Sequence, residues 1–127
     1  GARRVLSLAV SGPFHSSLLQ NAGKELEKEL SKVELSGLKI PYVTNVTAQY
    51  VTDAESVKPL LEKQVSSSVR WQQSVEMMIA DGVDTFIEIG PGKTLAGFMR
   101  KIDRSVKTLN VEKLEDIEKV VEALKEA

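Results

Sequence analysis

The stretch "DTFIEIGPGKTLAGFMRKID", residues 84 to 103, joins an apolar run rich in β-branched residues to a helix-like pattern through a turn with two glycines. We expect a strand at its start and a helix at its end. After it, "SVKTLNV" (105–111) predicts a second strand and "LEDIEKVVEALKEA" (114–127) a last helix with one apolar side. Strand and helix alternate with short connections, which predicts an α/β fold with a parallel sheet flanked by helices.

The residues before this stretch carry weaker signals of the same kinds. "RVLSLAVS" (4–11) reads as a short buried strand that stops at a Gly-Pro turn. Leu18, Ala22, Leu26 and Leu30 recur at four-residue spacing and predict a helix that Ser16 or Ser17 can cap. One or two strands are expected over 39–51, interrupted at Asn45. A helix should begin at 52–56 with a Thr52–Glu55 capping box and break at 66–68, and a further helix should run from Trp71 to Asp81.

The composition excludes several classes of site. The 127 residues, 42% hydrophobic, suit one ordinary domain, and a net charge of -1 does not support binding to nucleic acid or to an anionic membrane. No apolar run approaches the roughly twenty residues of a membrane span. Cysteine is absent, which excludes disulfides and thiolate nucleophiles and favours a reducing compartment, the cytoplasm. With a single histidine, we expect no metal cluster and no bound cofactor.

The glycine turn "EIGPGKT", residues 88 to 94, invites a comparison with phosphate-binding loops. The P-loop pattern needs a glycine where Ile87 stands, and the dinucleotide pattern needs one where Leu95 stands. Both patterns therefore fail. What remains is a tight strand-to-helix turn relieved by Gly90 and Gly92, with a helix N-terminus that could face an anion.

His15, the only histidine, lies in "LAVSGPFHSSLL" (8–19), between the apolar run and the first helix. A lone histidine there is most often a capping or partly buried polar side chain. The alternative is a general base for acyl transfer, which needs a serine to deprotonate and a group that orients the ring. Ser16 and Ser17 point away from the ring at a helix start, and the chain has no Gly-x-Ser-x-Gly motif. If His15 is catalytic, its serine lies elsewhere.

Four segments in order, "VSGPFHS" (10–16), "VTNVTA" (43–48), "VRWQQSVEMMIADGV" (69–83) and "FIEIGPGKTLAGF" (86–98), resemble the C-terminal part of malonyl-CoA:acyl carrier protein transacylases. The resemblance covers nearly the whole chain. It implies that His15 is the base of a Ser-His pair and that the backbone carbonyl of Gln64 orients its ring, in place of the carboxylate of other triads. One departure is Ser68, which stands where the family has a proline.

The resemblance also implies a domain organisation. Residues 1–11 would form the last strand of a small ferredoxin-like subdomain and the return to the large one, and residues 12–127 the C-terminal part of the large, α/β-hydrolase-like acyltransferase subdomain. The serine elbow, the oxyanion-hole glutamine segment and the arginine that holds the malonyl carboxylate are not found in this sequence. We therefore expect the chain to need a partner, the N-terminal portion with the catalytic serine, and to be inactive alone.

The implied reaction moves malonyl from coenzyme A, through a seryl ester, to the phosphopantetheine thiol of acyl carrier protein in fatty acid biosynthesis. Two alternatives stay open: the acyltransferase domain of a polyketide synthase, and a noncatalytic module that binds an anion or a protein at the Gly90–Gly92 turn. Related acyltransferases vary the residue before the base with their substrate, so the resemblance implies that Phe14 governs selectivity. Otherwise Phe14 is a core aromatic residue.

Overall fold

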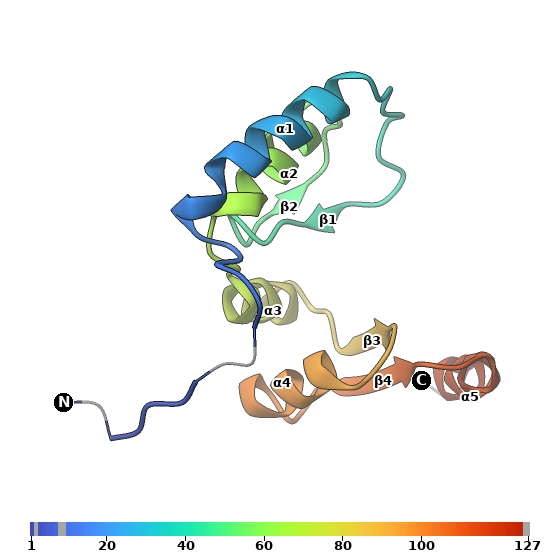
Figure 1. Cartoon of the computed structure of the whole chain (residues 1–127). Coiled ribbons are helices and arrows are strands. Elements are labelled where there is room, and N and C mark those ends of the chain that lie inside the picture. Colours follow the sequence, from blue (N-terminus) through green and yellow to red (C-terminus); the bar gives the residue numbers. More distant parts are fainter. Residues whose placement is uncertain (2, 8–9, 126–127) are drawn as a thin grey trace. The chain divides into compact units, whose positions relative to one another are not determined.

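The computed structural model describes residues 1, 3–7 and 10–125. The chain divides into two compact units, Gly1–Arg70 and Trp71–Ala127, which are described separately below (Figure 1). The subdomain boundary predicted after residue 11 falls inside the first unit and stays a prediction.

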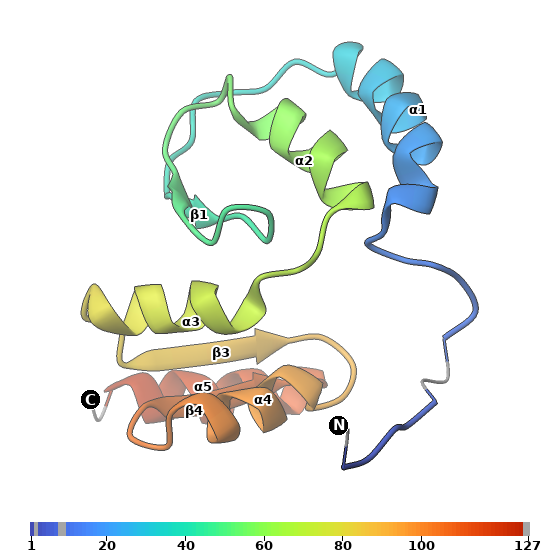
Figure 2. The ribbon, with the colours of Figure 1, turned by 90° about the vertical axis from the view of Figure 1, so that its left-hand side faces the viewer.

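The second unit has the architecture predicted from its alternating pattern. Its elements are α3 (Trp71–Ala80), β3 (Thr85–Ile89), α4 (Thr94–Ile102), β4 (Lys107–Val111) and α5 (Leu114–Lys125). β3 and β4 pair in parallel, with Ile87 opposite Leu109, and α4 makes the crossover between them. α4 and α5 lie on opposite sides of this sheet in Figures 1 and 2. The predicted α/β fold, a parallel sheet flanked by helices, is confirmed.

The first unit places two helices against each other beside a small hairpin. Its elements are the 3-10 turn η1 (Ser17–Leu19), α1 (Gln20–Ser31), the antiparallel strands β1 (Tyr42–Val43) and β2 (Tyr50–Val51), and α2 (Val57–Ser66). The hairpin turns around Asn45, as predicted, and α2 ends at the expected serine break. α1 and α2 form the main packing contact of this unit.

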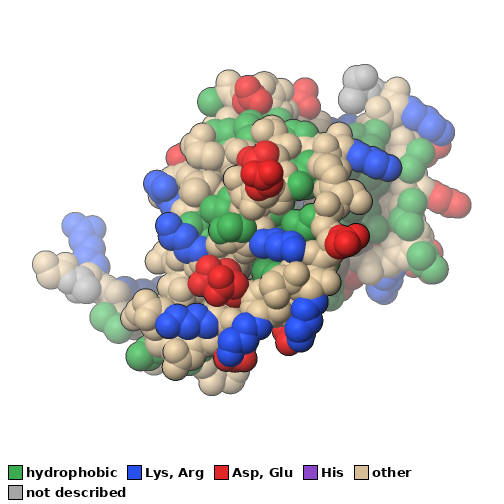
Figure 3. Space-filling view, turned by 90° about the horizontal axis from the view of Figure 1, so that it is seen from above, with side chains coloured by type: hydrophobic (Ala, Val, Ile, Leu, Met, Phe, Trp, Pro, Cys, Tyr) green, Lys and Arg blue, Asp and Glu red, His purple; other side chains and the backbone are tan. Residues whose placement is uncertain are grey.

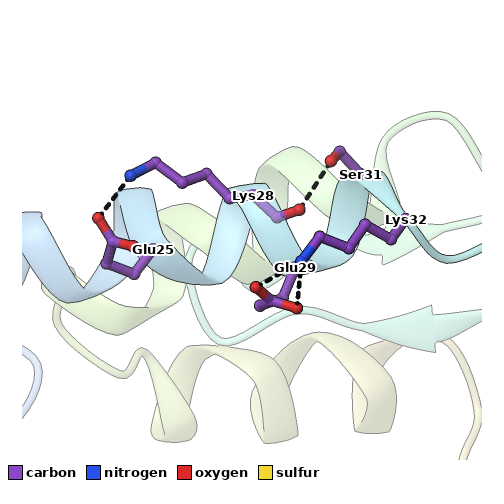
Figure 4. A network of polar contacts seen from close by, with 5 residues as sticks. All are labelled: Glu25, Lys28, Glu29, Ser31 and Lys32. Atoms are coloured by element: carbon purple, nitrogen blue, oxygen red, sulfur yellow. Dashed lines mark hydrogen bonds and ion pairs between the residues drawn. The ribbon is translucent and has the colours of Figure 1, made fainter.

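α1 contacts α2 through a glycine, while the members of its predicted apolar stripe differ in burial: Leu26 and Leu30 are half-buried. Gly23 is buried, whereas Ala22 is exposed and Leu18 keeps 78% of its surface exposed. The solvent side of α1 carries the pairs Glu25–Lys28 and Glu29–Lys32, with N–O distances of 2.7 and 2.8 Å (Figure 4). Such exposed pairs stabilise a helix by only about 0.2 to 0.5 kcal/mol each, so the contact with α2 decides where α1 lies.

Three local predictions are wrong. Residues 4–7 and 10–11 form no strand, and Val5 and Val10 are 86% and 64% exposed; residues 8 and 9 lie outside the described part. An extended segment becomes a strand only by pairing, and no described strand lies beside this one. Ser16 precedes η1 but makes no side-chain cap. At α2, Asp53 accepts the Ser56 N–H, in place of the Thr52–Glu55 box.

Charged groups of both signs are interspersed over the face shown in Figure 3, in line with the net charge of -1. That face therefore presents no broad surface of a single sign to a polyanion. Among the described residues, none of the helices has both the length and the apolar character needed to cross a membrane.

The lowered pKa values of three aspartates lead to a prediction of how the stability of the fold depends on pH. Hydrogen bonds from Ser56, from Ser105 and from the backbone N–H groups of Lys113 and Glu112 lower the pKa values of Asp53, Asp103 and Asp116, respectively. A pKa that is lower in the folded state stabilises the protein above the unfolded value of about 3.9, and this contribution is lost as the pH falls through the folded value. We therefore expect the melting temperature to decrease as the pH falls below about 4.

Thermal melts between pH 7 and pH 2.5 check this expectation. Asp116→Asn keeps the side-chain shape but cannot titrate, so its melting temperature should depend less on acid than that of the unchanged protein. An Asp116→Asn variant with an unaltered acid dependence would contradict the assignment.

Candidate active site

His15 lies in a tight turn between the N-terminal segment and η1. Its φ is +56°, in the left-handed region that a non-glycine residue adopts at a cost of about 1 to 3 kcal/mol. The Ser16 hydroxyl closes the turn by donating to the carbonyl of Pro13 at 2.7 Å, and the Ser16 carbonyl accepts the Leu19 N–H at 3.0 Å. These contacts hold the backbone of His15 in a costly conformation, as is common for residues at functional sites.

The imidazole of His15 contacts a carbonyl that lies 49 residues further along the chain. Its Nδ1 is 3.0 Å from the backbone oxygen of Gln64, near the end of α2. A carbonyl oxygen only accepts, so this contact requires the proton on Nδ1. The neutral ring then carries its lone pair on Nε2, which is the arrangement of a general base. The structure thus brings together the two residues that the resemblance paired.

The Gln64 carbonyl belongs to the last turn of α2, where helix carbonyls lack partners within the helix. It also accepts the Ser67 N–H, at the long distance of 3.4 Å, so its second lone pair is free for His15. The aligned peptide dipoles place about half a negative charge at a helix C-terminus. This end of α2 can therefore stabilise positive charge on the ring, the task that a buried carboxylate performs in other triads.

The segment after α2 is anchored even though Ser68 replaces the proline of the resembled family. The Arg70 N–H donates to the Asn45 carbonyl at 2.9 Å, and its guanidinium to the Thr47 carbonyl at 3.4 Å. Both acceptors belong to the loop between β1 and β2. With Ser68 at this position, the Gln64 carbonyl still faces His15.

Phe14, directly before His15, is 63% exposed. Its ring lies against Gly12, where a Cβ would meet two ring carbons at 3.5 Å. In the described part of the chain, Phe14 is therefore an exposed side chain and not a residue of the core.

The turn over residues 90–93 leads into α4, and carboxylates of this chain accept the N–H groups of the turn and of the start of α4. Gly90 and Gly92 have φ values of +144° and +86°, as predicted for a tight turn. The Glu88 carboxylate accepts the Leu95 and Ala96 N–H groups at 3.1 and 2.8 Å, and Glu112 accepts the Gly92 N–H at 3.2 Å. Two carboxylates thus occupy the donors that an anion would use, which disfavours the anion-binding alternative.

No group of three or more His, Cys, Asp or Glu side chains in the described ranges is arranged to hold a metal ion. The contact of Nδ1 of His15 with the Gln64 carbonyl is an arrangement suited to proton transfer by the imidazole.

Comparison with known proteins identifies relatives over almost the whole chain. The malonyl CoA-acyl carrier protein transacylase of Bacillus subtilis is 42% identical over 126 residues, which are 99% of this chain and 40% of that protein. The enzyme of the same name from Staphylococcus aureus is 47% identical over 117 residues, 92% of this chain and 38% of that protein. No protein-family model matches the chain.

Solved structures agree with these relatives. The malonyl CoA-acyl carrier protein transacylase of Clostridium perfringens superposes with a TM-score of 0.88 at 44% identity, over 95% of this chain and 38% of that one. A malonyl-transacylase in complex with its type II polyketide acyl carrier protein superposes with a TM-score of 0.89 at 32% identity, over 97% and 40% of the two chains. In sequence and in fold, the chain is thus a homologue of malonyl CoA-acyl carrier protein transacylases, spanning about two fifths of their length.

Proposed function

We propose that this chain is the C-terminal portion of a malonyl-CoA:acyl carrier protein transacylase and that it supplies the catalytic base, His15. One observation carries the proposal: the 3.0 Å contact that places the proton on Nδ1 and leaves Nε2 free as a base. The names of the relatives supply the substrate class, a malonyl thioester and a carrier protein. In this proposal the nucleophilic serine comes from the rest of the enzyme, since this chain spans only 40% of the Bacillus subtilis relative.

In the first half of the reaction, Nε2 of His15 takes the proton of the serine hydroxyl while the serine oxygen attacks the thioester carbonyl of malonyl-CoA. As the tetrahedral intermediate collapses, the C–S bond breaks and the imidazolium gives its proton to the departing coenzyme A thiolate. The product of this half is a malonyl-serine ester with a neutral imidazole, so His15 is ready for a second cycle.

In the second half, His15 takes the proton of the carrier's phosphopantetheine thiol, and the thiolate attacks the ester carbonyl. The C–O bond breaks, and the imidazolium returns its proton to the serine oxygen. The ring is positively charged in both halves while the intermediate exists. The end of α2, through the Gln64 carbonyl, stabilises that charge each time.

Acyl carrier protein is the proposed acceptor and fatty acid synthesis the proposed pathway. The complex between a malonyl-transacylase and a type II polyketide carrier supports a carrier protein as partner, since that enzyme matches 97% of this chain. A polyketide acyltransferase domain would perform the same chemistry with a different carrier. Assays with carriers from both kinds of pathway separate the two.

The mechanism is tested by steady-state kinetics of the chain assembled with a serine-bearing N-terminal portion. A covalent malonyl-enzyme predicts parallel lines in double-reciprocal plots when malonyl-CoA and carrier are varied, and a malonyl ester on serine that mass spectrometry detects in the absence of carrier. Intersecting lines, together with no trapped ester, would contradict the proposal.

Phe14→Ser is expected to relax selectivity between malonyl and methylmalonyl thioesters. Phe14 is exposed and directly precedes His15 in the chain, so we propose that its ring limits the room next to the α-carbon of the bound acyl group. One extra methyl group in a fitted pocket is worth about 1 to 3 kcal/mol, or roughly ten- to two-hundred-fold in kcat/KM. The ratio of kcat/KM for methylmalonyl-CoA to that for malonyl-CoA should rise by up to this factor.

Phe14→Leu provides the matched control for this prediction, because it keeps an apolar side chain and should change the ratio less than serine does. If Phe14→Ser lowers kcat/KM for both substrates by the same factor, or if it unfolds the protein, Phe14 is a packing residue and has no role in selectivity.

A further inference from the structure

Gly23, on α1, lies buried against the backbone of α2. A Cβ built on this buried glycine would lie 3.1 Å from the backbone oxygen of Glu62 and 3.8 Å from the Cβ of Val65. The first distance is shorter than an ordinary carbon–oxygen contact, so any side chain at this position must displace part of α2. The nearest obstacle is backbone and cannot turn aside as a flexible side chain would.

The two partners of the His15–Gln64 hydrogen bond lie on the two sides of this contact. Gln64 lies on α2 between Glu62 and Val65, the residues that Gly23 faces. His15 precedes η1, which continues directly into α1 at Gln20 and contacts both helices. A shift of α2 away from α1 at Gly23 therefore moves the carbonyl away from the imidazole.

We propose that Gly23 is a positioning residue, which sets the distance between Nδ1 of His15 and the Gln64 carbonyl by letting the two helix backbones meet. The inference rests on the proposed function for its effect on catalysis, but its structural part, the length of one hydrogen bond, is measured without any activity. Gly23 itself is buried between helices and has no side chain that could touch a substrate.

The geometry predicts a graded response to the size of residue 23. Alanine adds one carbon, which requires a shift of a few tenths of an ångström. Valine adds two more carbons and requires a larger one. Because the hydrogen bond starts at 3.0 Å and such bonds weaken beyond about 3.2 Å, the valine variant should lose it. A misplacement of about 1 Å in a catalytic group can lower the rate by about 100-fold.

The chain's single histidine makes this hydrogen bond directly measurable. The chain is labelled with 15N-histidine and assembled with an unlabelled N-terminal portion, so that His15 gives the only ring signals. In the unchanged protein, we expect the proton on Nδ1 and a downfield Nδ1–H resonance. In Gly23→Val, this resonance should move upfield or be lost to exchange, and kcat should fall by about 10- to 100-fold with KM for malonyl-CoA changed much less.

Lys24→Val is the matched control, since it places the same β-branched side chain one position along α1 at an exposed site. It should leave the Nδ1–H resonance and kcat as they are. If Gly23→Val does not fold, as judged by circular dichroism, Gly23→Ala takes its place and should shift the resonance in the same direction by a smaller amount.

A folded Gly23 variant with an unchanged Nδ1–H resonance would overturn the inference. If the resonance responds as expected but the unchanged assembly transfers no malonyl group, the inference stands and the proposed function fails. If Lys24→Val produces the same change as Gly23→Val, the effect comes from a weakened helix and the positioning role is rejected.

Discussion

His15→Ala in the assembled enzyme is expected to lower kcat for malonyl transfer by about 10⁴-fold or more, because a base and its serine act as one unit. Without the imidazole, the serine must attack as a neutral hydroxyl and the departing thiolate receives no proton from the enzyme. The KM for malonyl-CoA should change little, since the base acts mainly in the transition state. Single-turnover measurement of malonyl-serine formation checks the expectation at the step where His15 first acts.

Gln64→Ala is the companion variant, and it should retain activity within about threefold. The group that contacts His15 is the backbone carbonyl of Gln64, which alanine also provides, and alanine is well tolerated in a helix. If Gln64→Ala is as damaging as His15→Ala, the side chain of Gln64 acts in catalysis and the assignment of the carbonyl is wrong. If His15→Ala has no effect on kcat, His15 is not the base.

The second unit could be predicted closely because its signals are local. Each element between Thr85 and Lys125 shows the period of a strand or a helix, and the glycines mark the turn between β3 and α4. Short connections between alternating elements leave few topologies other than a parallel pair with a crossover helix. The capping of α4 by Glu88 was not predicted, since it depends on a side chain of a neighbouring strand.

The first unit shows where local reasoning fails. The stripe of Leu18, Ala22, Leu26 and Leu30 predicted a helix correctly, but the buried residue of that helix is Gly23, which a hydrophobic pattern does not register. The apolar residues around Val5 and Val10 predicted a buried strand, and they are exposed. A pattern can indicate that a segment is suited to burial, but it does not supply the neighbour that buries it.

The pairing of His15 with Gln64 came from resemblance to a family and not from the residues themselves. Every residue has a backbone carbonyl, so nothing in a sequence distinguishes the one that will orient an imidazole. The residues themselves offered only two general features: a lone histidine beside a Gly-Pro turn, and a predicted helix that ends in serines. His15 and Gln64, which these features contain, are 49 residues apart. The packing of η1 and α1 against α2 brings the two together.

The chain alone is expected to transfer no malonyl group to acyl carrier protein above the uncatalysed background. We propose that it supplies the base and the orienting carbonyl, while the serine comes from the part of the relatives that it does not span. A base without its nucleophile keeps at most the modest rate enhancement that substrate binding gives. Adding a separately produced N-terminal portion of a relative such as the Bacillus subtilis enzyme should restore transfer, measured with radiolabelled malonyl-CoA.

Two controls make this complementation specific. The same N-terminal portion mixed with the His15→Ala chain should form the complex, as judged by gel filtration, but give at least about 10³-fold less transfer. The N-terminal portion with its catalytic serine replaced should give no malonyl ester with either chain. Transfer by the purified 127-residue chain itself would show that it carries its own nucleophile, and the division of catalytic groups between the two portions would then be wrong.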